Sequence, residues 1–211
     1  MKTPSSRLGG LLLAALFTAL ATAGFSAEAT TTVYNRKSGL LPGWSPIAWG
    51  NITADNSKVV SKEAGGMSLA VMPTAQAAPY AGLQIVAGGG GVILTEAQRK
   101  GGEVHLYVRN GLDLTGAPAA DQSVQIMLTF QPDGAKAFNG KYEPVVLEPA
   151  QPADKPTAGW QLVKVSIPKQ LQDRADPSMP LKLRGVYVQY IDQPLAGFFI
   201  GEFLVVDPAA K

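Results

Sequence analysis

The stretch EVHLYVR, residues 103–109, alternates strictly between apolar and polar side chains. The apolar positions are Val104, Leu106 and Val108, and the polar ones are Glu103, His105, Tyr107 and Arg109. Because successive side chains of a β-strand leave opposite faces, this pattern predicts a strand with one buried face and one exposed face. The exposed face carries the single histidine of the chain, a tyrosine and an arginine, which can stack on a polar ligand and hydrogen-bond to it.

Short runs of the same kind recur along the chain, separated by glycine, proline, asparagine and aspartate. Alternation is clearest over residues 123–131, 160–168 and 183–191, and further strands are expected over residues 31–34, 68–72, 80–86 and 198–206. Helical turns are expected only over residues 96–100 and 169–173. Many short strands without a long amphipathic helix predict an all-β chain folded as an antiparallel β-sandwich.

Residues 1–29 have the features of a secretory signal peptide. Lys2 and Arg7 precede an apolar run over residues 11–21 that is too short to span a bilayer comfortably, and small residues follow. The sequences ATA at 21–23 and AEA at 27–29 both fit a cleavage site, and the choice between them stays open. We therefore expect a secreted or periplasmic protein, with residues 30–211 as one β-sandwich domain and no further membrane span.

The overall charge and the absence of cysteine narrow the classes of partner. The chain has 18 basic and 16 acidic residues, and loss of Lys2 and Arg7 with the signal would bring it close to neutral. A nearly neutral chain lacks the basic surface that nucleic acids require, so no nucleic-acid partner is expected. Without cysteine there are no disulfides, and a single histidine leaves no zinc site of the Cys/His type.

The order of motifs resembles that of the galactose-binding-like, jelly-roll carbohydrate-binding modules of secreted bacterial proteins. The motifs are VYN at 33–35 followed by Trp44 and Trp49, GGMSLAV at 65–71, YAGL at 80–83, VHLYV at 104–108, and the closing order of residues 160–168, 185–186 and 198–206. The resemblance implies a jelly-roll sandwich that binds a polysaccharide. In such modules an Asp-Asp pair often helps to hold a structural calcium ion. Gly201 and Glu202 replace that pair here, so calcium would depend on oxygens from Asn35 and Glu202.

Sugar recognition uses flat aromatic faces for pyranose rings and planar polar groups for their hydroxyls. The ligand-binding residues proposed on this basis are Trp44, Trp49, His105, Tyr107, Arg109, Gln125, Tyr187 and Gln189. Those on strands would share one surface if residues 103–109, 123–131 and 183–191 lie in one sheet. The alternative is that they are ordinary solvated positions and that Trp44 and Trp49 fill the core under loops. For Trp160 we expect a place in the core.

We do not expect an enzyme. His105 has no nucleophile motif of the Gly-x-Ser-x-Gly type beside it. No motif pairs the carboxylates of Glu103, Glu143, Asp192 and Glu202, as glycoside cleavage requires. The sequence thus predicts a non-catalytic carbohydrate-binding protein. Two alternatives stay open: an envelope structural or protein-interaction domain on the same fold, and, with less support, a small polysaccharide hydrolase or lyase.

Overall fold

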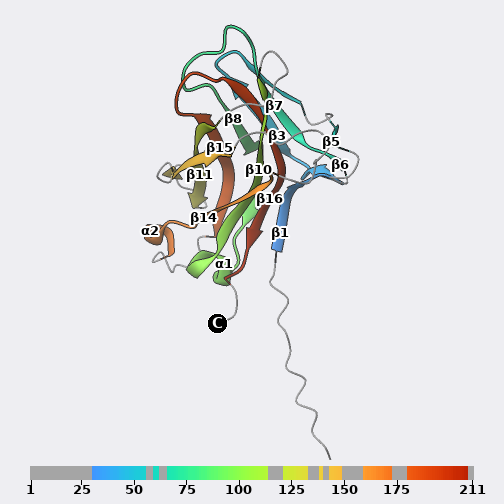
Figure 1. The fold of residues 1–211 in the computed structure, drawn as a ribbon. Coiled ribbons are helices and arrows are strands. Elements are labelled where there is room, and N and C mark those ends of the chain that lie inside the picture. The colour runs from blue at the N-terminus through green and yellow to red at the C-terminus, as the bar shows by residue number, and fades with distance from the viewer. Residues whose placement is uncertain are drawn as a thin grey trace, which may run out of the picture.

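The computed structural model describes residues 30–55, 59–61, 66–113, 121–132, 138–139, 143–148, 159–172 and 180–208. The predicted signal peptide over residues 1–29 lies outside the described residues. Two antiparallel sheets pack face to face over most of the described chain (Figure 1), which confirms the predicted β-sandwich. No helix among the described residues has the length and apolar character needed to cross a membrane.

The first sheet has seven strands. Its main path runs β14-β10-β16-β1-β2, while β7 also pairs with β16 and β4 pairs with β7. These strands are β1 (Thr30–Asn35), β2 (Gly39–Leu40), β4 (Ile52–Asp55), β7 (Leu69–Pro73), β10 (Glu103–Asp113), β14 (Gln161–Ser166) and β16 (Ala196–Val206). The opening stretch of alternating residues therefore lies in β10, which is hydrogen-bonded on both sides.

The second sheet also has seven strands. Its main path runs β12-β11-β15-β8-β3, while β13 pairs with β11 and β9 pairs with β15. These strands are β3 (Trp44–Trp49), β8 (Gly82–Ala87), β9 (Val92–Ile93), β11 (Gln122–Pro132), β12 (Phe138–Asn139), β13 (Glu143–Leu147) and β15 (Leu181–Tyr190). A separate two-stranded ribbon joins β5 (Val59–Ser61) to β6 (Gly66–Met67).

The core lies between the two sheets and is built from the apolar positions of the alternating strands. Val104, Leu106 and Val108 of β10 are fully buried, as are Ile126 and Leu128 of β11. Burial of this kind removes apolar side chains from water and is the main force that holds two sheets together. The polar residues of the same strands consequently point away from the core, onto the outer faces of the sandwich.

The strands over residues 103–109, 123–131 and 183–191 do not share one sheet. β11 and β15 are neighbours in the second sheet, whereas β10 belongs to the first. The expectation of a single surface for all three is therefore wrong. Alternation determines which side chains point outward, but it carries no information about which strands become partners.

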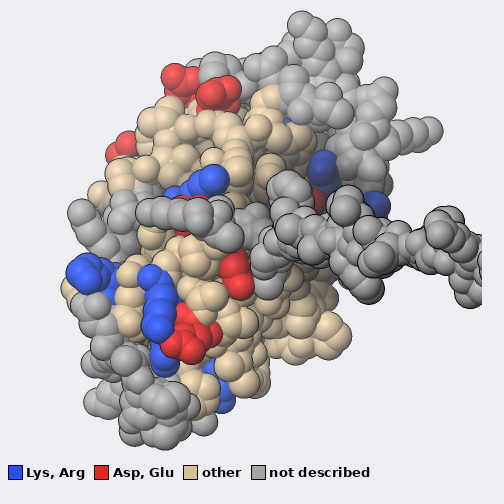
Figure 2. Space-filling view, turned by 90° about the horizontal axis from the view of Figure 1, so that it is seen from below, with Lys and Arg blue, Asp and Glu red and all other residues tan. Residues whose placement is uncertain are grey.

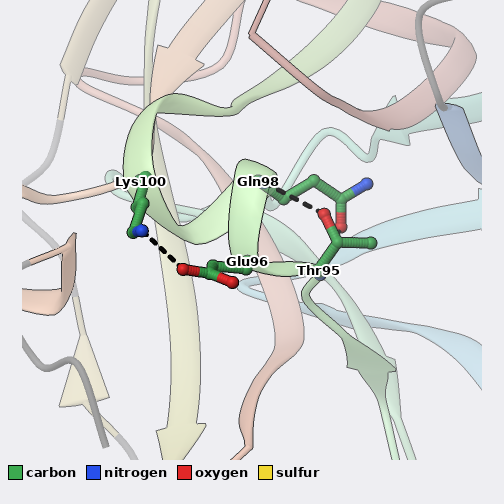
Figure 3. Close-up of polar contacts among 4 residues, drawn as sticks. All are labelled: Thr95, Glu96, Gln98 and Lys100. Atoms are coloured by element: carbon green, nitrogen blue, oxygen red, sulfur yellow. Dashed lines mark hydrogen bonds and ion pairs between the residues drawn. The ribbon is translucent and has the colours of Figure 1, made fainter. Parts of the chain in front are cut away.

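Two short helices, α1 (Glu96–Gly101) and α2 (Lys169–Gln172), contact each other at one end of the sandwich (Figure 1). Figure 3 shows how α1 begins: Thr95 Oγ1 accepts a hydrogen bond from the Gln98 backbone N–H, and Lys100 forms an ion pair with Glu96. Such a capping box satisfies backbone donors that a helix leaves unpaired at its start. On the face seen in Figure 2, acidic and basic side chains are interspersed rather than gathered into a patch of one sign.

Candidate functional site

The outer face of the second sheet brings polar and aromatic side chains into two adjacent rows. In the first row Trp49 of β3 is paired with Gly82, Gly82 with Gln189, and Gln189 with Gln125. In the second row Gln84 of β8 is paired with Tyr187 of β15. We call this surface the Trp49 platform and define it by Trp49, Gly82, Gln84, Gln125, Tyr187 and Gln189. It spans four strands, which is about 14 Å across the sheet.

The aromatic part of the platform is a half-buried indole that lies over a glycine. A Cβ atom placed on Gly82 would come within 2.4 Å of Trp49 Cζ2, so the six-membered ring of Trp49 occupies the space above Gly82. The ring of Tyr187 stands beside it, with the two centroids 5.9 Å apart and the planes inclined by 59°. The indole can pack directly against the sheet because the residue below it is a glycine.

The polar part of the platform is a chain of hydrogen bonds. Gln125 Nε2 donates to Gln189 Oε1 over 2.9 Å, and Gln189 Nε2 donates to the backbone carbonyl of Tyr80 over 2.8 Å. The same carbonyl also accepts a hydrogen bond from Trp49 Nε1 over 3.0 Å. These bonds fix the amide planes and the indole relative to one another, so the surface is arranged before any ligand arrives.

The platform is electrically neutral, because each of its defining residues is uncharged. The cationic side chains of β15, Lys182 and Arg184, lie near the start of the strand, whereas Tyr187 and Gln189 lie near its end. Arg184 donates to Gln131 Oε1 and to the Ala87 carbonyl. A ligand bound on the platform would therefore be held by ring contacts and neutral hydrogen bonds.

Four of the eight predicted ligand residues meet on this surface: Trp49, Gln125, Tyr187 and Gln189. Trp44 does not join them. The residue is 8% exposed, and its ring packs edge-to-face on Phe203 inside the core, with centroids 5.8 Å apart. Since β3 alternates, Trp44 points inward and Trp49 points outward although both come from the same tryptophan-rich stretch.

The other three predicted residues, His105, Tyr107 and Arg109, lie on β10 in the opposite sheet. His105 and Tyr107 are half-buried, and His105 Nε2 lies 2.8 Å from Glu103 Oε2. Arg109 is only 6% exposed, and this burial lowers the pKa of its guanidinium. They are separated from the Trp49 platform by the core, so the eight residues do not form one site.

The sequence-based prediction of site residues does not include Gln84 and Gly82 of the platform, nor Tyr80, whose carbonyl supports it. The alternation of residues 80–86 already indicates that Gln84 points away from the buried positions Leu83 and Ile85. The role of Tyr80 depends on its backbone carbonyl, and no sequence pattern reveals where a carbonyl points.

The first sheet carries a hollow of about 500 Å³ on its outer face. It is lined by Thr30, Thr32, Asn35, Arg36, Lys37, Ser38, Glu202 and Leu204. Asn35 and Glu202, the residues proposed for calcium, are paired in register between β1 and β16. Asn35 Oδ1 accepts backbone hydrogen bonds from Lys37 and Ser38, both over 2.8 Å.

The side chains of Asn35 and Glu202 alone supply too few oxygens for calcium. Ca²⁺ takes six to eight oxygen ligands, whereas the pair offers one carboxylate and one amide oxygen that already accepts two hydrogen bonds. Arg36 and Lys37 line the same hollow and add positive charge to it. Among the described residues, moreover, no group of three or more His, Cys, Asp or Glu side chains is placed to hold a metal ion.

Trp160 lies on the outside of the first sheet, and the expectation that it is a core residue is wrong. It is half-buried, and a Cβ atom on Gly201 would come within 2.8 Å of its ring. The guanidinium carbon of Arg36 stands 5.2 Å from the centroid of the ring, in the range of a cation–π contact. Because Gly201 has no side chain, the indole of Trp160 can pack on the outer face of the sheet there.

The carboxylates of Glu103 and Glu202 are far apart. Glu202 is paired with Tyr107, which is four residues along β10 from Glu103. That separation corresponds to about 13 Å along a strand. Paired carboxylates of glycosidases are about 5 to 9.5 Å apart, so this pair does not have their geometry.

Comparison with known proteins gives a match in fold and none in sequence. Neither a protein-family model nor a curated protein matches the chain. A family 11 carbohydrate-binding module from Clostridium thermocellum, solved in complex with a β-1,3-1,4-mixed-linked tetrasaccharide, aligns with a TM-score of 0.52 and 10% identity, over 88% of this chain and 100% of that one. This chain has the fold of a carbohydrate-binding module. The predicted jelly-roll sandwich is thereby confirmed.

Two further modules align less closely. The C-terminal family 22 module of a Clostridium thermocellum protein gives a TM-score of 0.47 and 13% identity, over 89% of this chain and 96% of that one. A family 29 module from Piromyces equi gives 0.46 and 12%, over 86% and 92%.

Proposed function

We propose that this protein is a non-catalytic carbohydrate-binding protein that recognises a glycan on the Trp49 platform. One observation carries the proposal: the neighbouring rings of Trp49 and Tyr187 lie beside the hydrogen-bonded amides of Gln125 and Gln189. Aromatic faces accept the apolar C–H faces of pyranose rings, and amide groups pair with sugar hydroxyls. Both kinds of group lie on this one neutral surface.

The hydrogen bonds within the platform leave groups for a ligand. A glutamine amide has two N–H donors and a carbonyl acceptor. Of the hydrogen bonds among the described residues, Gln125 uses one donor, and Gln189 uses one donor and its carbonyl. One N–H of each amide and the carbonyl of Gln125 remain for sugar hydroxyls. Because the amides are already oriented, little conformational entropy is lost when the sugar binds.

The shared fold supports the class of ligand. The family 11 module with which this chain aligns was solved with a bound tetrasaccharide. The signal-like residues 1–29 support export, so we propose a secreted or periplasmic protein whose partner is a polysaccharide.

A glycan array and affinity electrophoresis in soluble polysaccharides test this proposal. Tyr187→Ala and Tyr107→Ala form a matched pair, since both remove a half-buried tyrosine from an outer sheet face, one on the platform and one on the opposite sheet. We expect specific glycan binding that Tyr187→Ala loses and Tyr107→Ala retains, with both variants folded by circular dichroism.

Two results would contradict the proposal. Loss of binding in Tyr107→Ala but not in Tyr187→Ala would move the site to the first sheet. Failure of the wild-type protein to bind any glycan would favour the envelope protein-interaction domain, for which a proximity-labelling experiment in the cell envelope is the next step.

A further inference from the structure

Tyr80 has an unusual backbone for a large side chain. Its φ angle is +59°, in the left-handed region. Among the described residues only Asn51, at +58°, is another non-glycine residue with positive φ. Asparagine tolerates this region, whereas a bulky aromatic residue there is strained, and a glycine would adopt the same angle freely. Strained residues of this kind cluster at ligand-binding sites.

The backbone of Tyr80 is hydrogen-bonded to two platform residues. Its carbonyl accepts hydrogen bonds from both Trp49 Nε1 and Gln189 Nε2. Tyr80 lies two residues before Gly82, the first residue of β8, over which the Trp49 ring lies. The residue therefore flanks the row of Trp49, Gly82 and Gln189 at Gly82, on the side away from Gln84 and Tyr187.

The turn around Tyr80 is fixed from both sides. Asn51 and the preceding Gly50 accept backbone hydrogen bonds from Thr74 and Ala78, and Asn51 Nδ2 donates to the Gln76 carbonyl. On the other side Ala81 is fully buried, and its carbonyl accepts a hydrogen bond from the backbone N–H of Tyr190. A segment held in this way keeps Tyr80 in its strained conformation without help from its own side chain.

Tyr80 itself is 57% exposed as a residue. An exposed ring gains little from burial in the fold, so the fold does not account for a tyrosine at this position. Its backbone places it next to the indole and the amide that make up one row of the platform.

We infer that the Tyr80 ring forms an end wall of the Trp49 platform and contacts the bound glycan. The inference rests on the proposed function and adds a third aromatic contact to it. Since a tyrosine has few rotatable bonds and this backbone is fixed, the ring can contact a sugar at a low cost in entropy.

The test compares Tyr80→Gly, Tyr80→Phe and a matched control, Leu162→Ala, which removes an exposed apolar side chain from the opposite sheet. Binding to β-1,3-1,4-mixed-linked glucan, or to whichever glycan the wild type selects on the array, is measured by isothermal titration calorimetry, and thermal unfolding is recorded for each protein. Tyr80→Gly should weaken binding about tenfold, a typical loss for one well-placed aromatic contact. Its melting temperature should stay close to that of the wild type, because the glycine adopts the left-handed angle without strain. Tyr80→Phe and Leu162→Ala should bind as the wild type does, within about a factor of three.

The outcomes separate the two proposals. Wild-type affinity in Tyr80→Gly, together with loss of binding in Tyr187→Ala, would overturn the role of the Tyr80 ring and leave the platform in place. An equal loss in Tyr80→Gly and Tyr80→Phe would show that the ring face is not the contact. Absence of glycan binding by the wild type would instead remove the proposed function itself.

Discussion

Two tryptophans five residues apart should respond in opposite ways to the same substitution. Trp44 is buried in the core against Phe203, so Trp44→Ala leaves a cavity between the sheets. Large-to-small substitutions of a buried aromatic residue cost about 3 to 5 kcal/mol. Since domains are typically stable by about 5 to 15 kcal/mol, this change removes a large share of the free energy of unfolding.

Trp49→Ala should cost the fold less and the ligand more. The variant loses a tilted contact with Tyr187 and one hydrogen bond to the Tyr80 carbonyl. Together these contribute about 1 to 3 kcal/mol. An aromatic residue that anchors a ligand typically contributes at least about 2 kcal/mol of binding energy, which is roughly a thirtyfold change in the dissociation constant.

Urea denaturation followed by far-ultraviolet circular dichroism gives the first quantity, and calorimetric titration with a bound glycan gives the second. We expect Trp44→Ala to show the larger loss of stability and, where it is folded, an unchanged dissociation constant. We expect Trp49→Ala to show the smaller loss of stability and a clearly higher dissociation constant. Equal losses of stability, or loss of binding by a folded Trp44→Ala variant, would refute the assignment of one tryptophan to the core and the other to the platform.

Three further predictions concern the support of the platform, the core and the metal question. Gly82→Ala should displace the Trp49 ring, since the new Cβ would meet Cζ2 at 2.4 Å, and should weaken glycan binding in a titration; an unchanged affinity would contradict the packing. Burial raises the pKa of Tyr34 to about 12, while the unfolded chain keeps a value near 10. The unfolded state therefore loses the proton first, so the free energy of unfolding should be full below about pH 10 and fall between about pH 10 and 12. In urea titrations Tyr34→Phe should reduce this fall, and an identical pH profile would be evidence against it. Because Asn35 and Glu202 supply too few oxygens for calcium, EDTA should leave the melting temperature unchanged; a decrease that added calcium reverses would show a metal site.

The sequence predicts the faces of the strands well and their partners poorly. Alternation placed Val104, Leu106 and Val108 in the core, and all three are fully buried. It also placed Tyr187 and Gln189 outward, where the structure has them. These outcomes depend only on the two-residue period of a strand. The placement of β10 in the opposite sheet depends on long-range pairing, which no local pattern encodes.

The tryptophans show the same limit at the level of single residues. Trp44 and Trp49 lie in one stretch rich in glycine and proline, and both were candidates for ligand binding. Their opposite positions follow from the strand period once the stretch is known to be β3 rather than a loop. The sequence predicts a core position for Trp160, but the absence of a side chain at Gly201, 41 residues away, leaves room for its ring on the outer face.

Strand pairing brings together four of the eight predicted ligand residues. Gln125 and Gln189 lie on adjacent strands in register, so two outward amides become hydrogen-bonded neighbours. The two hydrogen bonds to the Tyr80 carbonyl depend on a left-handed backbone conformation at a tyrosine, which sequence propensities would not predict.

The most direct test of the platform is a ligand titration followed by ¹H–¹⁵N correlation NMR, in which the indole N–H signals are observed. The chain has three tryptophans, Trp44, Trp49 and Trp160, and they report on the core, the platform and the opposite sheet respectively. Substitution of each tryptophan in turn by phenylalanine assigns the three signals. On titration with a glycan that the protein binds, the Trp49 signal should shift and saturate while the other two stay in place. A saturable shift of the Trp160 signal with Trp49 unmoved would place the ligand on the first sheet and contradict the account.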